Sequence, residues 1–344
     1  MTNTANDNPP QTELSKLYNL YDSRDFIGAE NFCRNLLTTY PGSAEVSNML
    51  GVILVAQGKS QEALAVFADT IQRYPDYPTV YYDLGLLLNS LGQTEEAIEQ
   101  FSKAVELNTE FSDARNNLGV LLQNQNQHEK ALTHLEKARE LNPNNPFTYF
   151  NCANSLKVLG ERDKALENYN QAVKLHPSFS IAFNNRGNLL ESMDRDEDAK
   201  RSYTRAIELD RGYARAYSNR GIVEKKLGNY PGARQDFSKA VELDPWQPEK
   251  QNEDNNFKFR MYINLGDIQL YFGEFDKALE AYDRAGEIEP DNLDVLGFKS
   301  NAVAALGNLS EGLQLKQDSY GLVSFDLSKG VSVVHGSTNS SAQS

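Results

Sequence analysis

Side-chain amides recur in this sequence at a regular spacing. They form one column, 34 residues apart until a final step of 45: Asn117, Asn151, Asn185, Asn219 and Asn264, with Asp83 one period earlier. An amide offers both donors and acceptors, and asparagine costs a helix roughly half a kcal/mol, so its recurrence indicates a hydrogen-bonding role. Two roles fit the pattern: the amides hold the backbone of an extended peptide, or they bond to neighbouring helices and set the geometry of a repeat.

Other polar residues flank this column. They are Asn116, Asn124 and Asn154 in the middle of the chain, and Arg215, Lys225, Lys226 and Arg260 later. The basic group predicts a site for an acidic segment or a terminal carboxylate of a partner, or else ordinary solvated charges.

The residue types that carry out catalysis do not form a known motif. None of the histidines, His128, His134, His176 and His335, is paired with a cysteine at metal-ligand spacing. Glycine-rich phosphate loops and nucleophile motifs are also missing, and carboxylate pairs such as Glu95–Glu96 are typical of solvated helix starts. The sequence therefore predicts no catalytic residue, metal or cofactor, and a protein that is not an enzyme.

The asparagine column belongs to a repeat of 34 residues. One position of the repeat, which we call the small column, is glycine or alanine: Gly51, Gly85, Gly119, Ala153, Gly187, Gly221 and Gly266. A second position, which we call the ring column, carries a bulky side chain that is aromatic except at Leu135: Phe67, Phe101, Leu135, Tyr169, Tyr203, Phe237 and Tyr282. Two series of alanines, from Ala29 to Ala278 and from Ala104 to Ala285, also recur every 34 residues, with a final step of 45. Small residues facing bulky ones at helical spacing predict closely packed helix pairs.

Turn residues divide each repeat into two helices. Left-handed turns are expected at Gly58, Gly92, Asn126, Gly160, Asp194, Gly228, Gly273 and Gly307. The second helix is expected to end before Pro41, Pro75, Pro143, Pro177, Pro245 and Pro290. We therefore predict seven units over 10–247, at 10–43, 44–77, 78–111, 112–145, 146–179, 180–213 and 214–247, and an eighth over 259–292.

The first and last units depart from the pattern. The first has Leu17 in the small column and Cys33 in the ring column, as expected of a terminal repeat with one neighbour. Residues 293–318 keep a fainter pattern and predict a capping helical hairpin. An alternating pattern over 319–336 predicts a short β-hairpin or an extended tail. The polar ends 1–9 and 337–344 are expected to be disordered.

Residues 248–258 interrupt the register. The polar insertion is explained either by a bulging loop or by an extension of the preceding helix. It is either a tolerated surface insertion or a hinge or flap over a binding groove.

Composition narrows the class of protein. The net charge of -14 disfavours attraction to nucleic acid or anionic membranes. Two cysteines, Cys33 and Cys152, are too few for a disulfide framework and fit a reducing compartment. No apolar stretch approaches the roughly 20 residues of a membrane span, and no targeting signal is visible. We therefore expect a cytoplasmic protein without membrane insertion.

The sequence Asn117-Leu118-Gly119, with Ala131, Ala138 and Pro143, resembles the tetratricopeptide-repeat family. The resemblance implies an all-α, right-handed superhelical solenoid of antiparallel helix pairs, whose first helices line a concave groove for extended peptides. The asparagine column is similar to that of the repeat region of O-linked N-acetylglucosamine transferases, where amides hold a polypeptide backbone.

A carboxylate clamp of chaperone-binding family members matches only in part. Asn188, Asn219 and Arg260 stand at compatible positions, but Asn184 replaces a lysine and Asn264 an arginine. A co-chaperone role is therefore disfavoured.

The combined prediction is a protein-protein interaction scaffold or adaptor that binds an extended partner segment in its groove. Its oligomeric state stays open. The expected binding residues are Asn117, Asn151, Asn185, Asn219, Asn264, Asn154, Asn188, Arg215, Lys225, Lys226 and Arg260. Two alternatives share the same groove: a recognition module for a glycosyltransferase or oxygenase, and an assembly or secretion factor that holds a subunit.

Overall fold

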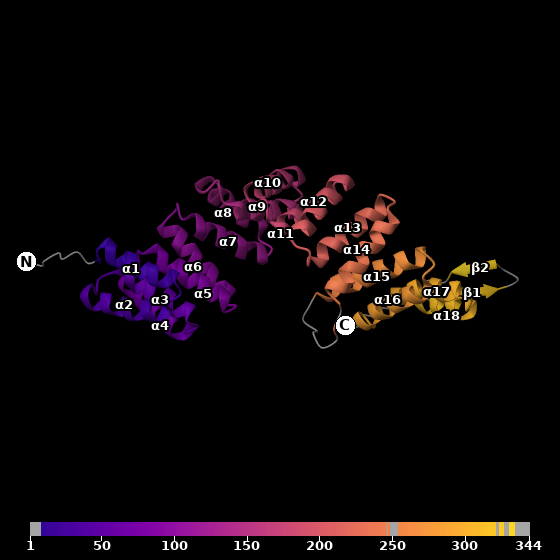
Figure 1. Cartoon of the computed structure of the whole chain (residues 1–344), viewed down its shortest axis with the longest axis horizontal. Helices are drawn as coiled ribbons and strands as arrows, with labels where there is room; N and C mark the ends of the chain where they lie inside the picture. Colours follow the sequence, from indigo (N-terminus) through magenta and orange to yellow (C-terminus); the bar gives the residue numbers. More distant parts are fainter. Residues whose placement is uncertain (1–7, 246, 248–253, 321–322, 327–329, 334–344) are drawn as a thin grey trace, which may run out of the picture. The chain divides into compact units, whose positions relative to one another are not determined.

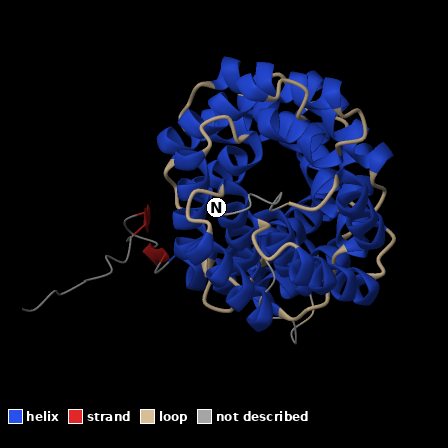
Figure 2. Cartoon of the chain, turned by 90° about the vertical axis from the view of Figure 1, so that its left-hand side faces the viewer, coloured by secondary structure: helices blue, strands red, loops and turns tan. Residues whose placement is uncertain are grey.

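The computed structural model describes residues 8–245, 247, 254–320, 323–326 and 330–333, and these residues are almost entirely helical (Figures 1 and 2). The predicted all-α fold of paired helices is confirmed. Most of the predicted disordered N-terminus, residues 248–253 of the insertion and the predicted disordered tail lie outside the described residues. At the N-terminal edge of the described chain, Asn8 accepts a hydrogen bond from the Ser43 hydroxyl at 3.0 Å, and Pro9 is buried.

Each repeat contributes a first and a second helix. The first helices are α1 (Gln11–Asp22), α3 (Ala44–Ala56), α5 (Pro78–Ser90), α7 (Ser112–Asn124), α9 (Pro146–Val158), α11 (Ser180–Ser192), α13 (Ala214–Lys226), α15 (Asn255–Tyr271) and α17 (Asp294–Ala305). The second helices are α2 (Phe26–Thr39), α4 (Ser60–Arg73), α6 (Thr94–Leu107), α8 (His128–Leu141), α10 (Arg162–Leu175), α12 (Asp196–Leu209), α14 (Tyr230–Leu243), α16 (Phe275–Ile288) and α18 (Leu309–Tyr320).

The helix pairs form two compact bodies, which we call the N-terminal stack (residues 1–176) and the C-terminal stack (residues 177–344). Within each stack a second helix packs against the first helix of its own repeat and against the first helix of the next, as α12 packs against α11 and α13. One helical layer is thus shared between neighbouring repeats. In the N-terminal stack, this sharing joins the buried residues from Leu14 to Cys152 into one core.

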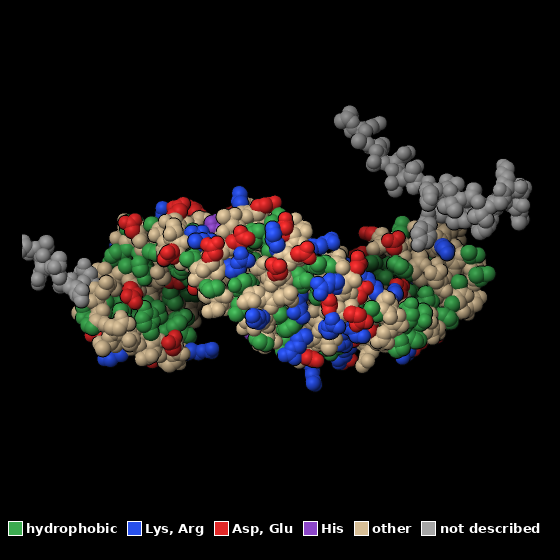
Figure 3. Space-filling view, turned by 90° about the horizontal axis from the view of Figure 1, so that it is seen from above, with side chains coloured by type: hydrophobic (Ala, Val, Ile, Leu, Met, Phe, Trp, Pro, Cys, Tyr) green, Lys and Arg blue, Asp and Glu red, His purple; other side chains and the backbone are tan. Residues whose placement is uncertain are grey.

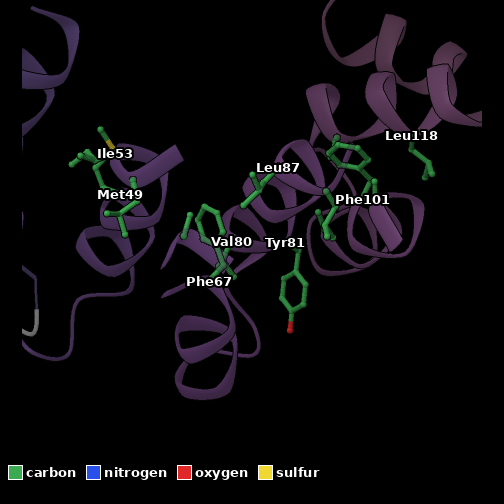
Figure 4. Packing of buried hydrophobic residues seen from close by; sticks show 14 of the residues in the cluster. Met49, Ile53, Phe67, Val80, Tyr81, Leu87, Phe101 and Leu118 are labelled. Carbon is green, nitrogen blue, oxygen red and sulfur yellow. The ribbon is translucent and has the colours of Figure 1, made fainter. Parts of the chain in front are cut away.

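The core depends on contact between the small column and the ring column. A Cβ added to Gly51 would lie 2.3 Å from Cε1 of Phe67, and one added to Gly187 would lie 2.5 Å from Cε1 of Tyr203. Phe67 and Tyr203 are fully buried, and Figure 4 shows Phe67 within the core of the N-terminal stack. The glycines therefore let the backbone of each first helix approach a ring of the second helix.

The first repeat carries residues of exchanged size at the small and ring positions. Leu17 and Cys33, which hold the small and ring positions, are both fully buried. The Cys33 thiol donates to the carbonyl of Val46 on α3 at 3.2 Å. A large residue opposite a small one preserves the total volume, so this repeat is compensated at this contact even though its sequence pattern is degenerate.

The predicted left-handed turns are confirmed, with φ values from 57° at Asp194 to 94° at Gly307. Arg24 occupies the same turn of the first repeat with φ of 62°, which the sequence pattern did not identify. An arginine in this region of φ is strained, because its Cβ crowds the backbone.

The last residues of the insertion form the first turn of the helix that follows it. Helix α14 ends at Leu243, two residues before Pro245, as second helices end before proline in other repeats. Helix α15 has 17 residues against 13 in α13, so the extra turn lies at its N-terminus. The Asp254 carboxylate caps this turn by accepting from the N–H of Phe257 at 3.0 Å.

The C-terminal end combines a helix pair with a short hairpin. A Cβ on Gly312 would lie 2.8 Å from the carbonyl oxygen of Ser300, so α17 and α18 also approach closely through a small residue. Strands β1 (Val323–Asp326) and β2 (Gly330–Val333) pair antiparallel, with Val323 opposite Val333.

Replacing Arg24 with glycine should stabilise the protein by about 1 kcal/mol, because glycine adopts positive φ without strain. Urea unfolding followed by circular dichroism should show the higher midpoint. The matched change is Gly58→Arg, at the same turn of the next repeat, where no atom lies within 4 Å of an added Cβ. It should lower stability through backbone strain alone; an unchanged midpoint in both variants would contradict this account.

Candidate functional site

The asparagine column joins successive first helices. In each bond a residue of the column meets the side chain 35 residues earlier, on the first helix of the preceding repeat. The pairs are Asn48 Nδ2 to Asp83 Oδ2 at 2.6 Å, Asn117 Nδ2 to the Tyr82 hydroxyl at 3.3 Å, Asn151 Nδ2 to Asn116 Oδ1 at 3.2 Å, and Asn219 Nδ2 to Asn184 Oδ1 at 3.1 Å. These bonds correspond to the second predicted role, that of setting the repeat geometry.

Asn154 and Asn188 have a different partner, the tyrosines of the ring column. The hydroxyl of Tyr169 donates to Asn154 Oδ1 at 2.5 Å, and that of Tyr203 to Asn188 Oδ1 at 2.8 Å. Asp267 accepts in the same way from Tyr282, at 2.9 Å. Repeats whose ring position is Phe or Leu carry an aliphatic residue at the accepting position: Val52, Leu86, Val120 and Ile222. A buried hydroxyl needs an acceptor and a phenylalanine does not.

This pairing was readable in the sequence as a correlation between two columns 15 residues apart, and the sequence analysis missed it. It gives Asn154 and Asn188 a role within their own repeats. Asn188 Oδ1 also accepts from Asn219 at 2.9 Å, so it connects the two polar columns.

A double-mutant cycle tests whether the side chains of Tyr203 and Asn188 stabilise the fold through their hydrogen bond. Tyr203→Phe and Asn188→Ile together recreate the Phe237–Ile222 pair of the next repeat. Each single change should destabilise the protein by about 1 kcal/mol, because it removes the hydrogen bond between the two side chains, while Asn188 Oδ1 keeps its bond from Asn219 and the Tyr203 hydroxyl keeps Glu191 at 3.3 Å. The double variant should lose about 1 kcal/mol less than the sum of the two, as measured by urea unfolding. Strict additivity would show that the two side chains are not coupled.

Asp83 is the acidic member of the asparagine column. Burial raises the pKa of its carboxyl to about 6, which the hydrogen bond from Asn48 only partly opposes. Its carboxylate forms no ion pair with a described residue. The charge of Asp83 in turn raises the pKa of two neighbouring phenols, those of Tyr77 and Tyr82.

Because the pKa is higher in the folded than in the unfolded chain, an ionised Asp83 lowers stability above about pH 6, and the effect vanishes below about pH 4. Asp83→Asn should therefore stabilise the protein by about 1–2 kcal/mol at about pH 7.5, a value discounted for partial exposure. The gain should disappear at about pH 3.5, below the pKa of the carboxyl in the unfolded chain. Thermal unfolding at both pH values tests this, and a gain independent of pH would contradict it.

Three of the predicted basic residues are engaged in ion pairs. Lys225 Nζ lies 3.4 Å from Asp267 on α15, and Lys226 Nζ lies 2.8 Å from Glu191 on α11. Arg215 pairs with Asp254 at 2.8 Å. Acidic and basic side chains are similarly intermixed over the face in Figure 3. Such pairs are solvent-exposed and contribute little stability. Their basic groups nevertheless already have acidic partners, with which an acidic ligand would have to compete.

A pocket of about 400 Å³ lies in the C-terminal stack, between α11, α13 and α15. Its lining brings together six of the predicted binding residues: Asn185, Asn188, Arg215, Asn219, Arg260 and Asn264. Lys225 and Lys226 do not line it, and Asn117, Asn151 and Asn154 belong to the N-terminal stack. This pocket therefore contains six of the eleven predicted binding residues.

Residues of the insertion complete this pocket. Asp254, Asn256 and Phe257 line it at the first turn of α15. The guanidinium of Arg215 lies 4.5 Å from the centre of the Phe257 ring and pairs with Asp254, which holds the start of α15 against α13. The sequence showed that the insertion interrupts the register, but not which side chains it adds to the pocket.

The free donors of the pocket lie on one face of α15. Arg260 is exposed and forms no ion pair with a described residue, and Asn264, one turn later, is half-buried without a hydrogen bond to a described residue. The Asn219 amide nitrogen is already bonded to Asn184 and Asn188. The pocket can therefore donate hydrogen bonds from α15 to the oxygens of a ligand.

The described part of the chain contains neither a membrane-spanning helix nor a metal-binding cluster. None of its helices is long and apolar enough to span a bilayer. Its His, Cys, Asp and Glu side chains nowhere gather in groups of three or more that could hold a metal ion. Cys33 and Cys152 are free and buried, and burial raises the pKa of both thiols to about 12.

Comparison with protein-family models matches three models of the tetratricopeptide repeat. The first matches residues 112–145 and 214–246, the second 18–78 and 48–109, and the third 181–213 and 259–292. A search of curated proteins gives no match.

Similar folds occur among solved structures. The APC/C hetero-tetramer Cut9-Hcn1 matches with a TM-score of 0.56 and 17% identity, over 85% of this chain and 55% of that one. Pseudomonas aeruginosa pilF matches with a TM-score of 0.51 and 21% identity, over 59% and 88%. YrrB, described as a TPR protein with an unusual peptide-binding site, has a TM-score of 0.46 and 26% identity, over 58% and 97%. The first two similarities support the same fold.

Proposed function

Since this chain belongs to the tetratricopeptide-repeat family, we propose that it is a non-enzymatic scaffold that binds an extended segment of a partner protein in the pocket of the C-terminal stack. Tetratricopeptide repeats in general serve as scaffolds for protein interaction. The specific proposal concerns the surface used, the pocket between α11, α13 and α15.

The observation that carries this proposal is the pair of unengaged donors on α15. Arg260 and Asn264 face a pocket whose other amides are largely occupied by each other. An extended peptide exposes carbonyl oxygens along its backbone and needs donors of this kind. Tyr213, Ile222 and Phe257 line the same pocket and supply apolar surface for the side chains of the segment.

This proposal uses a smaller set of residues than the sequence suggested. Lys225 and Lys226 are assigned to ion pairs that join α13 to its neighbours, and Asn117 and Asn151 to bonds between first helices. A role as a recognition module of a glycosyltransferase depended on the whole asparagine column, so these bonds weaken it. A cytoplasmic location, supported by the two free cysteines, remains part of the proposal.

Peptides selected from a random library on the whole chain should depend on α15. Arg260→Ala and Asn264→Ala should each weaken the selected peptides about tenfold or more, because each removes donors that no other side chain replaces. Fluorescence anisotropy with labelled peptides measures the affinities.

The matched control is Arg284→Ala, an exposed arginine on the second helix α16 that pairs with Glu287. It should leave the affinities unchanged. The proposal is wrong if every selected peptide keeps its affinity for both the Arg260 and the Asn264 variants.

A further inference from the structure

A second polar patch lies on the first helices of the N-terminal stack, and its charge is opposite to that of Arg260. It consists of Tyr18, Glu45, Asn48, Tyr77 and Asp83, which we call the acidic patch. The Tyr18 hydroxyl donates to Glu45. Burial raises the pKa of Tyr77, and the charges of Glu45 and Asp83 raise it further, which shows that this phenol lies near both carboxylates. The patch thus spans α1, α3 and the start of α5.

Among the described residues, no basic side chain pairs with a carboxylate of this patch. Neither Glu45 nor Asp83 forms an ion pair with a described residue. Glu30, in the same stack, shows the usual arrangement: Lys59 at 2.9 Å and Arg34 at 2.8 Å lower its pKa to about 2. Half-buried carboxylates without such partners carry a desolvation cost that a cation would relieve.

Asn48 gives independent evidence of a missing donor. It is 5% exposed, and its Nδ2 donates to Asp83 at 2.6 Å. The Oδ1 atom of the same amide is buried and has no hydrogen-bond partner. A buried acceptor without a donor is rare in folded proteins. This oxygen, the carboxylate of Asp83 and that of Glu45 are all acceptors. Tyr18 donates to Glu45 and Asn48 to Asp83, but no described side chain donates to Asn48 Oδ1 or forms an ion pair with either carboxylate.

We propose that the acidic patch binds the side chain of an arginine or lysine of the partner protein. A guanidinium supplies several N–H donors and a positive charge in one planar group, and tyrosine rings favour cations at their faces. This inference rests on the proposed function, because the cation belongs to a bound partner segment. It adds a site of opposite charge to the donors of α15.

A competing explanation needs no ligand. A protonated Asp83 could donate its own proton to Asn48 Oδ1 once the amide is turned over, which gives this oxygen a donor but moves Nδ2 to the buried position that has no partner. The two explanations differ in whether a cation binds, so one titration separates them.

The test titrates the whole ¹⁵N-labelled chain at neutral pH with N-acetyl-arginine amide and follows the side-chain amide signals of Asn48 by NMR. The control ligand is N-acetyl-citrulline amide, which has nearly the same shape and no charge. Arginine should produce a saturable shift, and citrulline should bind about tenfold more weakly, because it lacks the charge-assisted bonds.

Two variants locate the site. Asp83→Asn and Glu45→Gln should each weaken arginine binding about tenfold. Asn is the residue that the next repeats carry in the column of Asp83, so this variant should fold and keep its bond to Asn48. The matched control, Glu62→Gln on the exposed face of α4, should bind arginine like the wild type.

The inference is overturned if arginine gives no saturable shift, if citrulline binds equally well, or if Asp83→Asn keeps full affinity. Arg260→Ala should not change arginine binding, because it lies in the other stack. If arginine binds but the selected peptides do not depend on α15, the proposed function of the C-terminal pocket fails while the cation site stands.

Discussion

Each repeat depends on one close contact, between the backbone of its first helix and a bulky side chain of its second. At Gly51 even a methyl group would lie 2.3 Å from a ring atom of Phe67, so the two helices meet at a distance that only glycine or a compensating change permits. The first repeat shows the compensation, with Leu17 opposite Cys33. Because second helices are shared between repeats, this contact also sets where the next first helix lies.

The polar columns follow from this packing. First helices held close together present side chains to each other along one line, and the amides bond across it with the side chains of the preceding repeat. Tyrosine in the ring column adds a hydroxyl to the interior, and Asn154, Asn188 or Asp267 accepts from it. Many of the polar side chains that the sequence predicted to bind a ligand therefore form hydrogen bonds within the protein.

What remains unsatisfied differs between the two stacks. The C-terminal stack has free donors at Arg260 and Asn264, on a helix whose start is held by Asp254 and Arg215. In the described part of the N-terminal stack, Asn48 Oδ1 has no hydrogen-bond donor, and the Glu45 and Asp83 carboxylates have no basic partner. A ligand gains most affinity from polar groups that are buried without a partner, because these groups are already partly desolvated before the ligand binds.

The sequence by itself determined the helix pairs, the close contact and the turns, because these depend on residues that recur at one spacing: the small column, the ring column and the positive-φ positions. It also identified Arg260 and Asn264 as polar residues of first helices. Only the tertiary structure decided which polar residues are free. Asn151 and Asn264 are equivalent in sequence, yet one bonds to Asn116 and the other has no described partner. That difference arises from the neighbouring repeat, 35 residues or more away, and local pattern carries no information about such a partner.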